Sequence, residues 1–288
     1  MEVIKTQRKT TYAAIDSLRP ELSTHGRSAL VTGAGTGVGA AIAKALARSG
    51  VSHLALLGRT ESTLNKTKAE ISALGVSAII SVFITDIVDP DSVNNAVKAF
   101  AESTPSGKID ILIANAAHLA DIRSIPDVDP TDFWKSFQTT VLGNFNLLRT
   151  FQPVAASNAS VIHITTAAIV IPYIPGYGAY RSSKIAAYKL FETFFYENPG
   201  FFGLHVHPGL IFGTASSDKV EESLKEAGLG HLRDDISISG DFVVWSLSEE
   251  ARFLSGRFVS ATWDVEELKS KKEDLEKNAV MFTVGLLG

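Results

Sequence analysis

The segment SALVTGAGTGVG, residues 28–39, joins a short apolar run to a cluster of glycines and decides the fold class. Residues 28–32 predict a β-strand, and a helical pattern over residues 40–49 follows the glycines. Glycine accepts positive φ and lets a backbone approach a pyrophosphate closely. The start of the next helix offers free N–H groups to phosphates. A strand, a glycine turn and a helix in this order therefore predict a dinucleotide-binding βαβ unit.

The rest of the chain repeats this alternation of short apolar runs and longer helical patterns. The nearly continuous apolar strands are typical of a sheet that is covered on both faces. Strands separated by helices predict parallel pairing, so we expect an α/β, Rossmann-like, doubly wound parallel sheet of about seven strands with helices on both faces. The further expected strands are residues 54–57, 78–84, 109–114, 160–165, 204–207 and 258–261, and the further helices are 61–74, one starting at Asp89-Pro90, 131–151 and 180–198.

Composition narrows the functional classes. The 288 residues are 45% hydrophobic and 20% charged, with a net charge of −4 and a pI near 6.0. This balance gives no reason to expect binding to nucleic acid or to an anionic membrane. The chain has no cysteine, which excludes disulfides, thiol nucleophiles and cysteine metal sites. With no apolar leader and no long apolar run, the sequence predicts a cytoplasmic protein.

No internal repeat, low-complexity tract or linker divides the chain. We expect an N-terminal arm, residues 1–24, as a surface extension, followed by a single catalytic domain, residues 25–288. Within it, residues 212–240 predict a substrate lid with a short amphipathic helix. The C-terminal extension begins near residue 265, and its charged part, residues 266–277, predicts a solvated helix.

The end of the second strand indicates which nicotinamide cofactor binds. NAD-binding units of this kind usually carry an acid there, which bonds the ribose hydroxyls. Here the strand runs into Arg59 and Thr60. A guanidinium can pair with a 2′-phosphate through charge-assisted hydrogen bonds, and the threonine hydroxyl can add one more. The sequence therefore favours NADP(H).

A tyrosine and a lysine four residues apart, Tyr180 and Lys184, form the pattern YxxxK. Residues at this spacing share one face of a helix. An ammonium beside a phenol stabilises the phenolate, so we expect a lowered pKa for Tyr180. Such a tyrosine can exchange a proton with a carbonyl or an alcohol oxygen.

The spacing TGxxxGxG, together with YxxxK after the fifth expected strand, resembles the classical short-chain dehydrogenase/reductase family. The C-terminal third, including GRFVSATWDVEEL, resembles fungal members with roles in small-molecule biosynthesis. The resemblance implies an oxidoreductase with a nicotinamide cofactor, and members of the family commonly assemble as dimers or tetramers. The absence of cysteine and of clustered histidines predicts that no metal is bound. The resemblance also implies a role for Lys184 on the nicotinamide ribose and cofactor contacts from Tyr180. Further cofactor residues implied are Thr32, Gly33, Gly35, Thr36, Gly37, Val38 and Gly39 in the turn, Asp86, Ile87, Asn115 and Ala116 after the third and fourth strands, and Pro208, Gly209, Ile211 and Thr214 after the sixth.

Two supporting positions depart from the family pattern. Where the family has a serine that holds the substrate oxygen, Thr166 is the best match and Thr165 the alternative. A threonine hydroxyl donates and accepts like that of serine. Where the family has a relay asparagine, this chain has Thr140, and we expect Asn144 to face elsewhere on its helix.

The expected substrate is a small apolar or aromatic carbonyl or hydroxyl compound. The scattered histidines, His53, His118, His163, His205 and His207, favour packing roles, with His118 close enough to the site to approach the substrate. The topology that the resemblance implies places five apolar or aromatic residues near the site, where they would line the pocket: Ile169, Tyr173, Tyr177, Phe212 and Trp245.

The leading hypothesis is a carbonyl reductase or alcohol dehydrogenase in which Tyr180 exchanges the proton. Because Thr140 and Thr166 replace the family residues, two alternatives remain open. One is a non-redox isomerisation, cyclisation or elimination on the same fold, and the other is a non-catalytic NADPH-binding protein.

Overall fold

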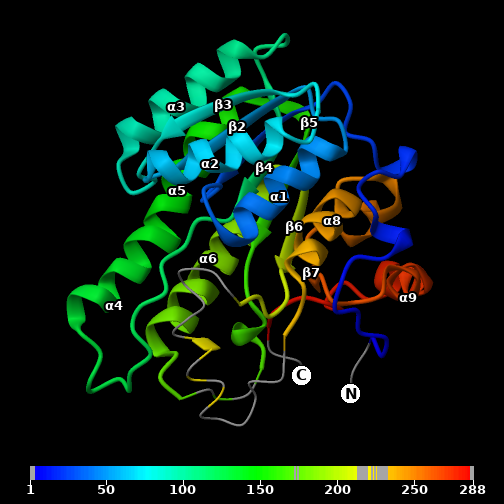
Figure 1. Cartoon of the computed structure of the whole chain (residues 1–288). Coiled ribbons are helices and arrows are strands. Elements are labelled where there is room, and N and C mark those ends of the chain that lie inside the picture. Colours follow the sequence, from blue (N-terminus) through cyan, green and yellow to red (C-terminus); the bar gives the residue numbers. More distant parts are fainter. Residues whose placement is uncertain are drawn as a thin grey trace.

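The computed structural model describes residues 4–171, 173, 175–212, 220, 221, 223, 225 and 233–285. Its centre is a seven-stranded sheet, which confirms the predicted fold class (Figure 1). All of its strand pairs are parallel, in the order β3-β2-β1-β4-β5-β6-β7. The strands are β1 Ser28–Thr32, β2 His53–Gly58, β3 Ile79–Ile84, β4 Ile109–Ala114, β5 Ala155–Ile164, β6 Phe202–His207 and β7 Phe258–Ser260.

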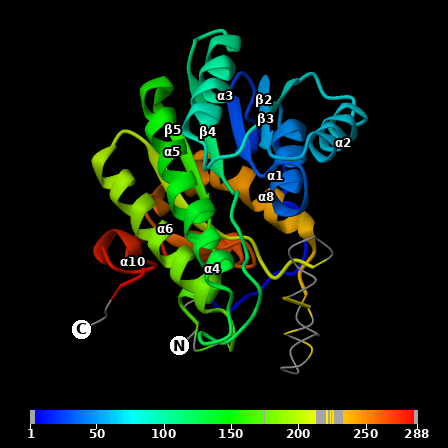
Figure 2. The same cartoon turned by 90° about the vertical axis from the view of Figure 1, so that its left-hand side faces the viewer.

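Helices cover both faces of the sheet, with α1, α2 and α8 on one side and α3, α5 and α6 on the other (Figure 2). Neighbouring strand residues alternate between the two apolar clusters that result. Val31 packs with the α1 and α8 side and Leu30 with the α3 and α5 side. The helices are α1 Gly37–Arg48, α2 Glu61–Ser72, α3 Pro90–Ser103, α4 Pro130–Phe137, α5 Gly143–Phe151, α6 Gly178–Glu197, α8 Ile236–Ser246, α9 Val265–Ser270 and α10 Lys272–Lys277. Within the described residues, no helix combines the length and hydrophobicity that a bilayer span requires.

Two expected helices differ in detail. The helix predicted over residues 131–151 contains a π-helical turn, Gln138–Leu142, between α4 and α5. The segment predicted as one solvated helix over residues 266–277 forms both α9 and α10. It buries Leu268 and Leu275, so its inner face belongs to the core.

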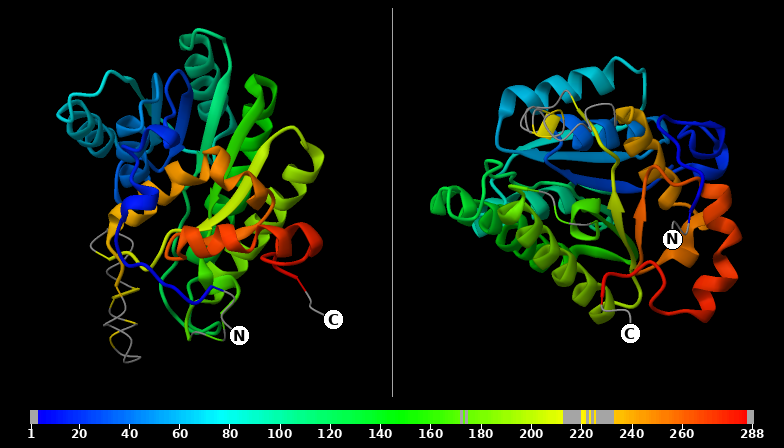
Figure 3. Two further views of the ribbon diagram at one scale, coloured as in Figure 1. Left: turned by 90° about the vertical axis from the view of Figure 1, so that its right-hand side faces the viewer. Right: turned by 90° about the horizontal axis from the view of Figure 1, so that it is seen from below.

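The N-terminal arm was expected to be a surface extension, and this is wrong for its described part. Ile4 and Ile15 are fully buried in the cluster that includes α8. Arg8 forms an ion pair with Asp264 at 2.7 Å. The arm therefore runs along the α8 and α9 side of the domain and packs into it (Figure 3).

Helix α8 begins inside the segment predicted as a lid, yet it is part of the core. Every residue from Ile238 to Ser246 is buried, and the helix packs against α1. Trp245, expected in the substrate pocket, is fully buried, and its indole N–H donates to Glu250 at 3.1 Å. Its role is therefore packing.

We expect Trp245→Ala to lower the free energy of unfolding by about 3–5 kcal/mol, because it leaves a large cavity in a close-packed cluster. Urea unfolding followed by circular dichroism measures this. Trp134→Ala is the matched control, because the Trp134 side chain is 59% exposed and its loss should cost under about 1 kcal/mol. Unchanged stability in Trp245→Ala, with a changed KM for substrate, would indicate that Trp245 lines the substrate pocket after all.

Candidate functional site

The glycine turn after β1 is shaped for close backbone approach. Gly33 and Gly37 have positive φ, 65° and 55°. A Cβ at Gly39 would overlap the Gly33 carbonyl and lie 2.6 Å from Asn115 Nδ2. Thr36, at the N-cap of α1, makes no side-chain capping hydrogen bond. The first amides of α1 therefore remain available to an anion.

Hydrogen bonds join the turn to the end of β4. The Thr32 hydroxyl accepts from the amides of Asn115 and Ala116 at 3.0 and 3.1 Å. The Asn115 amide side chain donates to the Thr32 carbonyl at 2.9 Å. The strand order reverses at this point, between β1 and β4. Crevices at such points, beside the carboxyl ends of the strands, are where open α/β sheets bind ligands.

The other predicted cofactor residues that the structure describes lie at the same edge of the sheet, each after its strand. Arg59 and Thr60 follow β2 and are exposed, and no carboxylate of the described residues pairs with Arg59. Asp86, after β3, is exposed, and its side chain accepts from the Val88 amide at 3.0 Å. Ile87 is buried and lies against Gly143. Pro208, Gly209 and Ile211 follow β6, and Thr214 lies outside the described residues.

Tyr180, Lys184 and Thr166 meet at the carboxyl end of β5. The side chains of Thr166 and Tyr180 lie close together, and the threonine hydroxyl favours ionisation of the phenol. Lys184 is buried, and its Nζ donates to the Ile164 carbonyl at 2.9 Å. This nitrogen lies 6.0 Å from the centre of the Tyr180 ring. The structure thus brings three of the predicted catalytic residues together and pairs Tyr180 with Thr166 rather than with the alternative, Thr165.

Burial dominates the electrostatics of this cluster. Burial raises the pKa of Tyr180 to about 12, although the neighbouring Thr166 hydroxyl acts in the opposite direction. It lowers the pKa of Lys184 to about 8. The expected lowering of the Tyr180 pKa is therefore wrong, because desolvation of the phenolate outweighs the favourable contacts. Near neutral pH the phenol holds its proton and the lysine is mostly charged.

Thr140 lies in the π-helical turn and is fully buried. Its hydroxyl accepts from the His118 amide at 3.4 Å, and its carbonyl accepts from Asn144 Nδ2 at 2.8 Å. Asn144 was expected to face elsewhere, but it reaches back to Thr140 because residues four apart share a helix face. Its Oδ1 is buried with no hydrogen-bond partner among the described residues. The i,i+4 spacing was the sequence signal that could have linked this asparagine to Thr140.

The expected pocket residues divide into two groups. Tyr177 is buried, with its ring edge-on to Tyr180 at 6.4 Å between centroids. Ile169 is partly buried between β5 and α6, and Phe212 is partly buried beneath the Arg233 guanidinium at 5.2 Å. Tyr173, in contrast, is 81% exposed. Tyr177 is therefore the member with a contact to the predicted catalytic tyrosine.

The buried histidines have packing roles. His163 and His205 share a hydrogen bond between their Nδ1 atoms at 3.1 Å, and His163 stacks on Phe191 at 4.2 Å. Burial lowers the pKa of His205 to about 3 and that of His163 well below its usual value, so both are neutral. His118 is bonded through Nε2 to Asp132 at 2.6 Å. The described residues contain no group of three or more potential ligands that could hold a metal ion.

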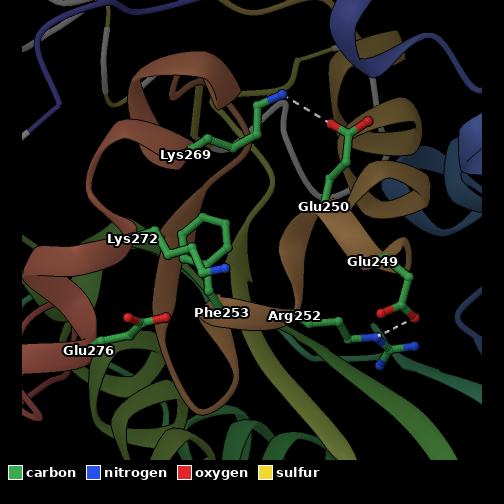
Figure 4. Close-up of a pocket in the computed structure, with 7 residues that line it drawn as sticks. All are labelled: Glu249, Glu250, Arg252, Phe253, Lys269, Lys272 and Glu276. Carbon is green, nitrogen blue, oxygen red and sulfur yellow. Dashed lines mark hydrogen bonds and ion pairs between the residues drawn. The ribbon is translucent and has the colours of Figure 1, made fainter.

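A surface cavity of about 530 Å³ lies beside α9 and α10, apart from the residues of the predicted site (Figure 4). Charged side chains of both signs line it, and several pair with one another. Lys269 contacts Glu250 at 3.2 Å, and Arg252 contacts Glu249 at 3.4 Å. The lining residues are Glu249, Glu250, Arg252, Phe253, Lys269, Lys272 and Glu276.

Solved structures share this fold. A short-chain dehydrogenase from Burkholderia cenocepacia in complex with NADP has a TM-score of 0.71 at 24% identity, covering 84% of this chain and 98% of that one. A 7α-hydroxysteroid dehydrogenase complexed with NADH has a TM-score of 0.72 at 22% identity, covering 88% and 97%. At these identities the likeness supports the fold alone.

Sequence comparison identifies the family. A short-chain dehydrogenase/reductase of Claviceps purpurea is 30% identical over 98% of this chain and 94% of its own length. The short-chain dehydrogenase pigC of Monascus ruber is 29% identical over 95% of this chain and 90% of its own. The family model for short chain dehydrogenases matches residues 27–199, which hold the glycine turn and both Tyr180 and Lys184. The chain therefore belongs to the short-chain dehydrogenase family.

Proposed function

We propose that this chain is an NADP(H)-dependent carbonyl reductase or alcohol dehydrogenase that acts on a small apolar or aromatic compound. The observation that carries the proposal is the placement of Tyr180 beside both Thr166 and the buried Lys184, at the carboxyl end of β5. Family membership supports an oxidoreductase that uses a nicotinamide cofactor.

The residues present fit a dinucleotide. The turn leaves no room for a Cβ at Gly39, and the uncapped start of α1 suits a pyrophosphate. Arg59 is exposed, with no carboxylate partner among the described residues, and suits a 2′-phosphate. Asn115 links this cradle to β4, and Gly209 and Ile211 would meet the nicotinamide end. When bound, the cofactor supplies or accepts the hydride.

Side chains of the protein transfer the proton and stabilise the resulting charge. With a pKa of about 12, Tyr180 enters the reduction as a neutral phenol and can give its proton to the substrate oxygen. Thr166, whose side chain lies next to that of Tyr180, would hold the same oxygen in place. Lys184, charged below about pH 8, stabilises the phenolate that forms and would hold the nicotinamide ribose.

The walls of the site favour an apolar substrate. Tyr177 presents an aromatic edge next to Tyr180, and Ile169 adds an aliphatic surface. A cytoplasmic location and assembly into a dimer or tetramer stay predictions from the sequence.

Cofactor binding followed by oxidation tests the proposal. The purified protein is titrated with NADPH and with NADH, and a panel of aliphatic and aromatic ketones is then added while nicotinamide absorbance is followed. We expect tighter binding of NADPH and loss of absorbance with at least one apolar ketone. Tight NADPH binding without oxidation across the panel would favour the non-redox alternative.

A further inference from the structure

Two hydrogen bonds join Asp234 to Leu210, which lies 24 positions earlier in the sequence. The Leu210 amide donates to Asp234 Oδ2 at 2.7 Å, and the Asp234 amide donates to the Leu210 carbonyl at 3.0 Å. Both polar groups of the Leu210 backbone are therefore satisfied by one residue. Leu210 follows directly on the Pro-Gly pair after β6, where the proposed function places the nicotinamide contacts.

The approach of the two segments is close. Gly209 has a φ of +96°, and a Cβ there would lie 3.1 Å from Asp234 Oδ2. Ser239, in the first turns of α8, donates its hydroxyl to the Pro208 carbonyl at 2.7 Å. Three consecutive residues after β6 are thus fitted against the segment that leads into α8.

The N-terminal arm secures that segment from the other side. The Asp235 amide donates to the Lys9 carbonyl at 2.6 Å, and Thr11 Oγ1 donates to Asp241 Oδ2 at 2.6 Å. Asp241 also pairs with Arg48 on α1 at 2.6 Å. The carboxylate that holds Leu210 therefore belongs to a backbone that is braced by the arm and by α8.

The character of the carboxylate fits an acceptor role. Burial raises the pKa of Asp234 above its usual value, and the hydrogen bond from Leu210 and the charge of Lys9 only partly oppose this rise. Hydrogen bonds to an ionised acceptor are shorter and stronger than neutral ones, and the Leu210 contact is correspondingly short.

We propose that Asp234 is a positioning residue, which fixes the backbone of residues 208–210 so that the nicotinamide half of the cofactor finds a preformed contact surface. This inference rests on the proposed function. The adenosine half would be held by the glycine turn and Arg59, which take no part in the hydrogen bonds between Asp234 and Leu210.

The test compares Asp234→Ala with Asp234→Asn and with the control Asp235→Ala. Asparagine keeps a carbonyl acceptor for the Leu210 amide, whereas alanine removes it. Asp235 is also acidic and adjacent, but its side chain caps α8 by accepting from the Ser237 amide. The readouts are hydrogen exchange at the Leu210 amide without cofactor, and affinities for NADPH and for 2′,5′-ADP, which lacks the nicotinamide.

In Asp234→Ala we expect Leu210 exchange to rise and NADPH affinity to fall, each by about tenfold, in keeping with loss of a hydrogen bond to a charged group. Affinity for 2′,5′-ADP should stay within about twofold. Asp234→Asn should recover most of both losses, and Asp235→Ala should leave all three readouts unchanged.

Unchanged NADPH affinity in Asp234→Ala would overturn the inference. So would equal losses for NADPH and 2′,5′-ADP, because they would indicate a general structural role. Failure of the proposed function would appear in the unaltered protein, as an inability to bind NADPH, and is therefore distinguishable from failure of the inference.

Discussion

Tyr180→Phe should lower kcat for ketone reduction by about 10²- to 10⁴-fold, the range that a positioned general acid contributes. The phenol is protonated and lies beside Thr166, and phenylalanine keeps the ring while it removes the proton. Affinity for NADPH should stay nearly unchanged, because the glycine turn and Arg59 are untouched. Steady-state kinetics and NADPH fluorescence titration measure the two effects.

Tyr188→Phe is the matched control for this prediction. Tyr188 is on the same helix and fully buried, but its hydroxyl accepts from the Val284 amide at 3.3 Å. Loss of the Tyr188 hydroxyl in Tyr188→Phe should leave kcat unchanged. Full activity in Tyr180→Phe would remove Tyr180 from proton transfer, and a large loss in both variants would point to disturbed packing of α6.

The sheet could be predicted because its strands carry strong local signals. Leu54, Ala55, Leu56 and Leu57 form an uninterrupted apolar run, as a strand buried on both faces requires, and β2 spans them. The glycine turn could be predicted as well, because Gly33 and Gly37 adopt a positive φ that few other residues tolerate.

Helix α8 could not be recognised in the same way. It is buried nearly all round, so its sequence lacks the amphipathic period that marks a surface helix. Trp245 was therefore assigned to the pocket instead of the core. The arm was misjudged for a related reason, because Ile4 and Ile15 are isolated apolar residues whose burial depends on distant elements.

The candidate site shows the same division between local pattern and three-dimensional context. Strand alternation favoured Thr166 over Thr165, and Thr166 is the residue whose side chain lies beside that of Tyr180. The pKa of Tyr180 was misjudged because the pattern YxxxK specifies the neighbouring lysine and says nothing of burial. The hydrogen bonds between Asp234 and Leu210 likewise could not be predicted, since these residues are 24 positions apart in the sequence.

Arg59→Asp should invert the cofactor preference. We expect NADPH affinity to fall by about 10²-fold or more, since the change removes charge-assisted hydrogen bonds and places a carboxylate beside a phosphate. Affinity for NADH should change little, because NADH has no 2′-phosphate and the new acid can accept from its ribose hydroxyls. Titration of nicotinamide fluorescence with both cofactors measures the ratio of their affinities.

Lys68→Asp controls for the change in net charge, because Lys68 is an exposed cation on α2 that is outside the predicted site. It should alter both affinities by less than about threefold, since charges that are separated by more than a Debye length are largely screened at physiological salt. A fall in NADPH affinity that persists at high salt in Arg59→Asp and is absent in Lys68→Asp would mark a direct phosphate contact. Equal affinities before and after the Arg59 substitution would remove Arg59 from the cofactor site, and the 2′-phosphate would then need a different partner after β2.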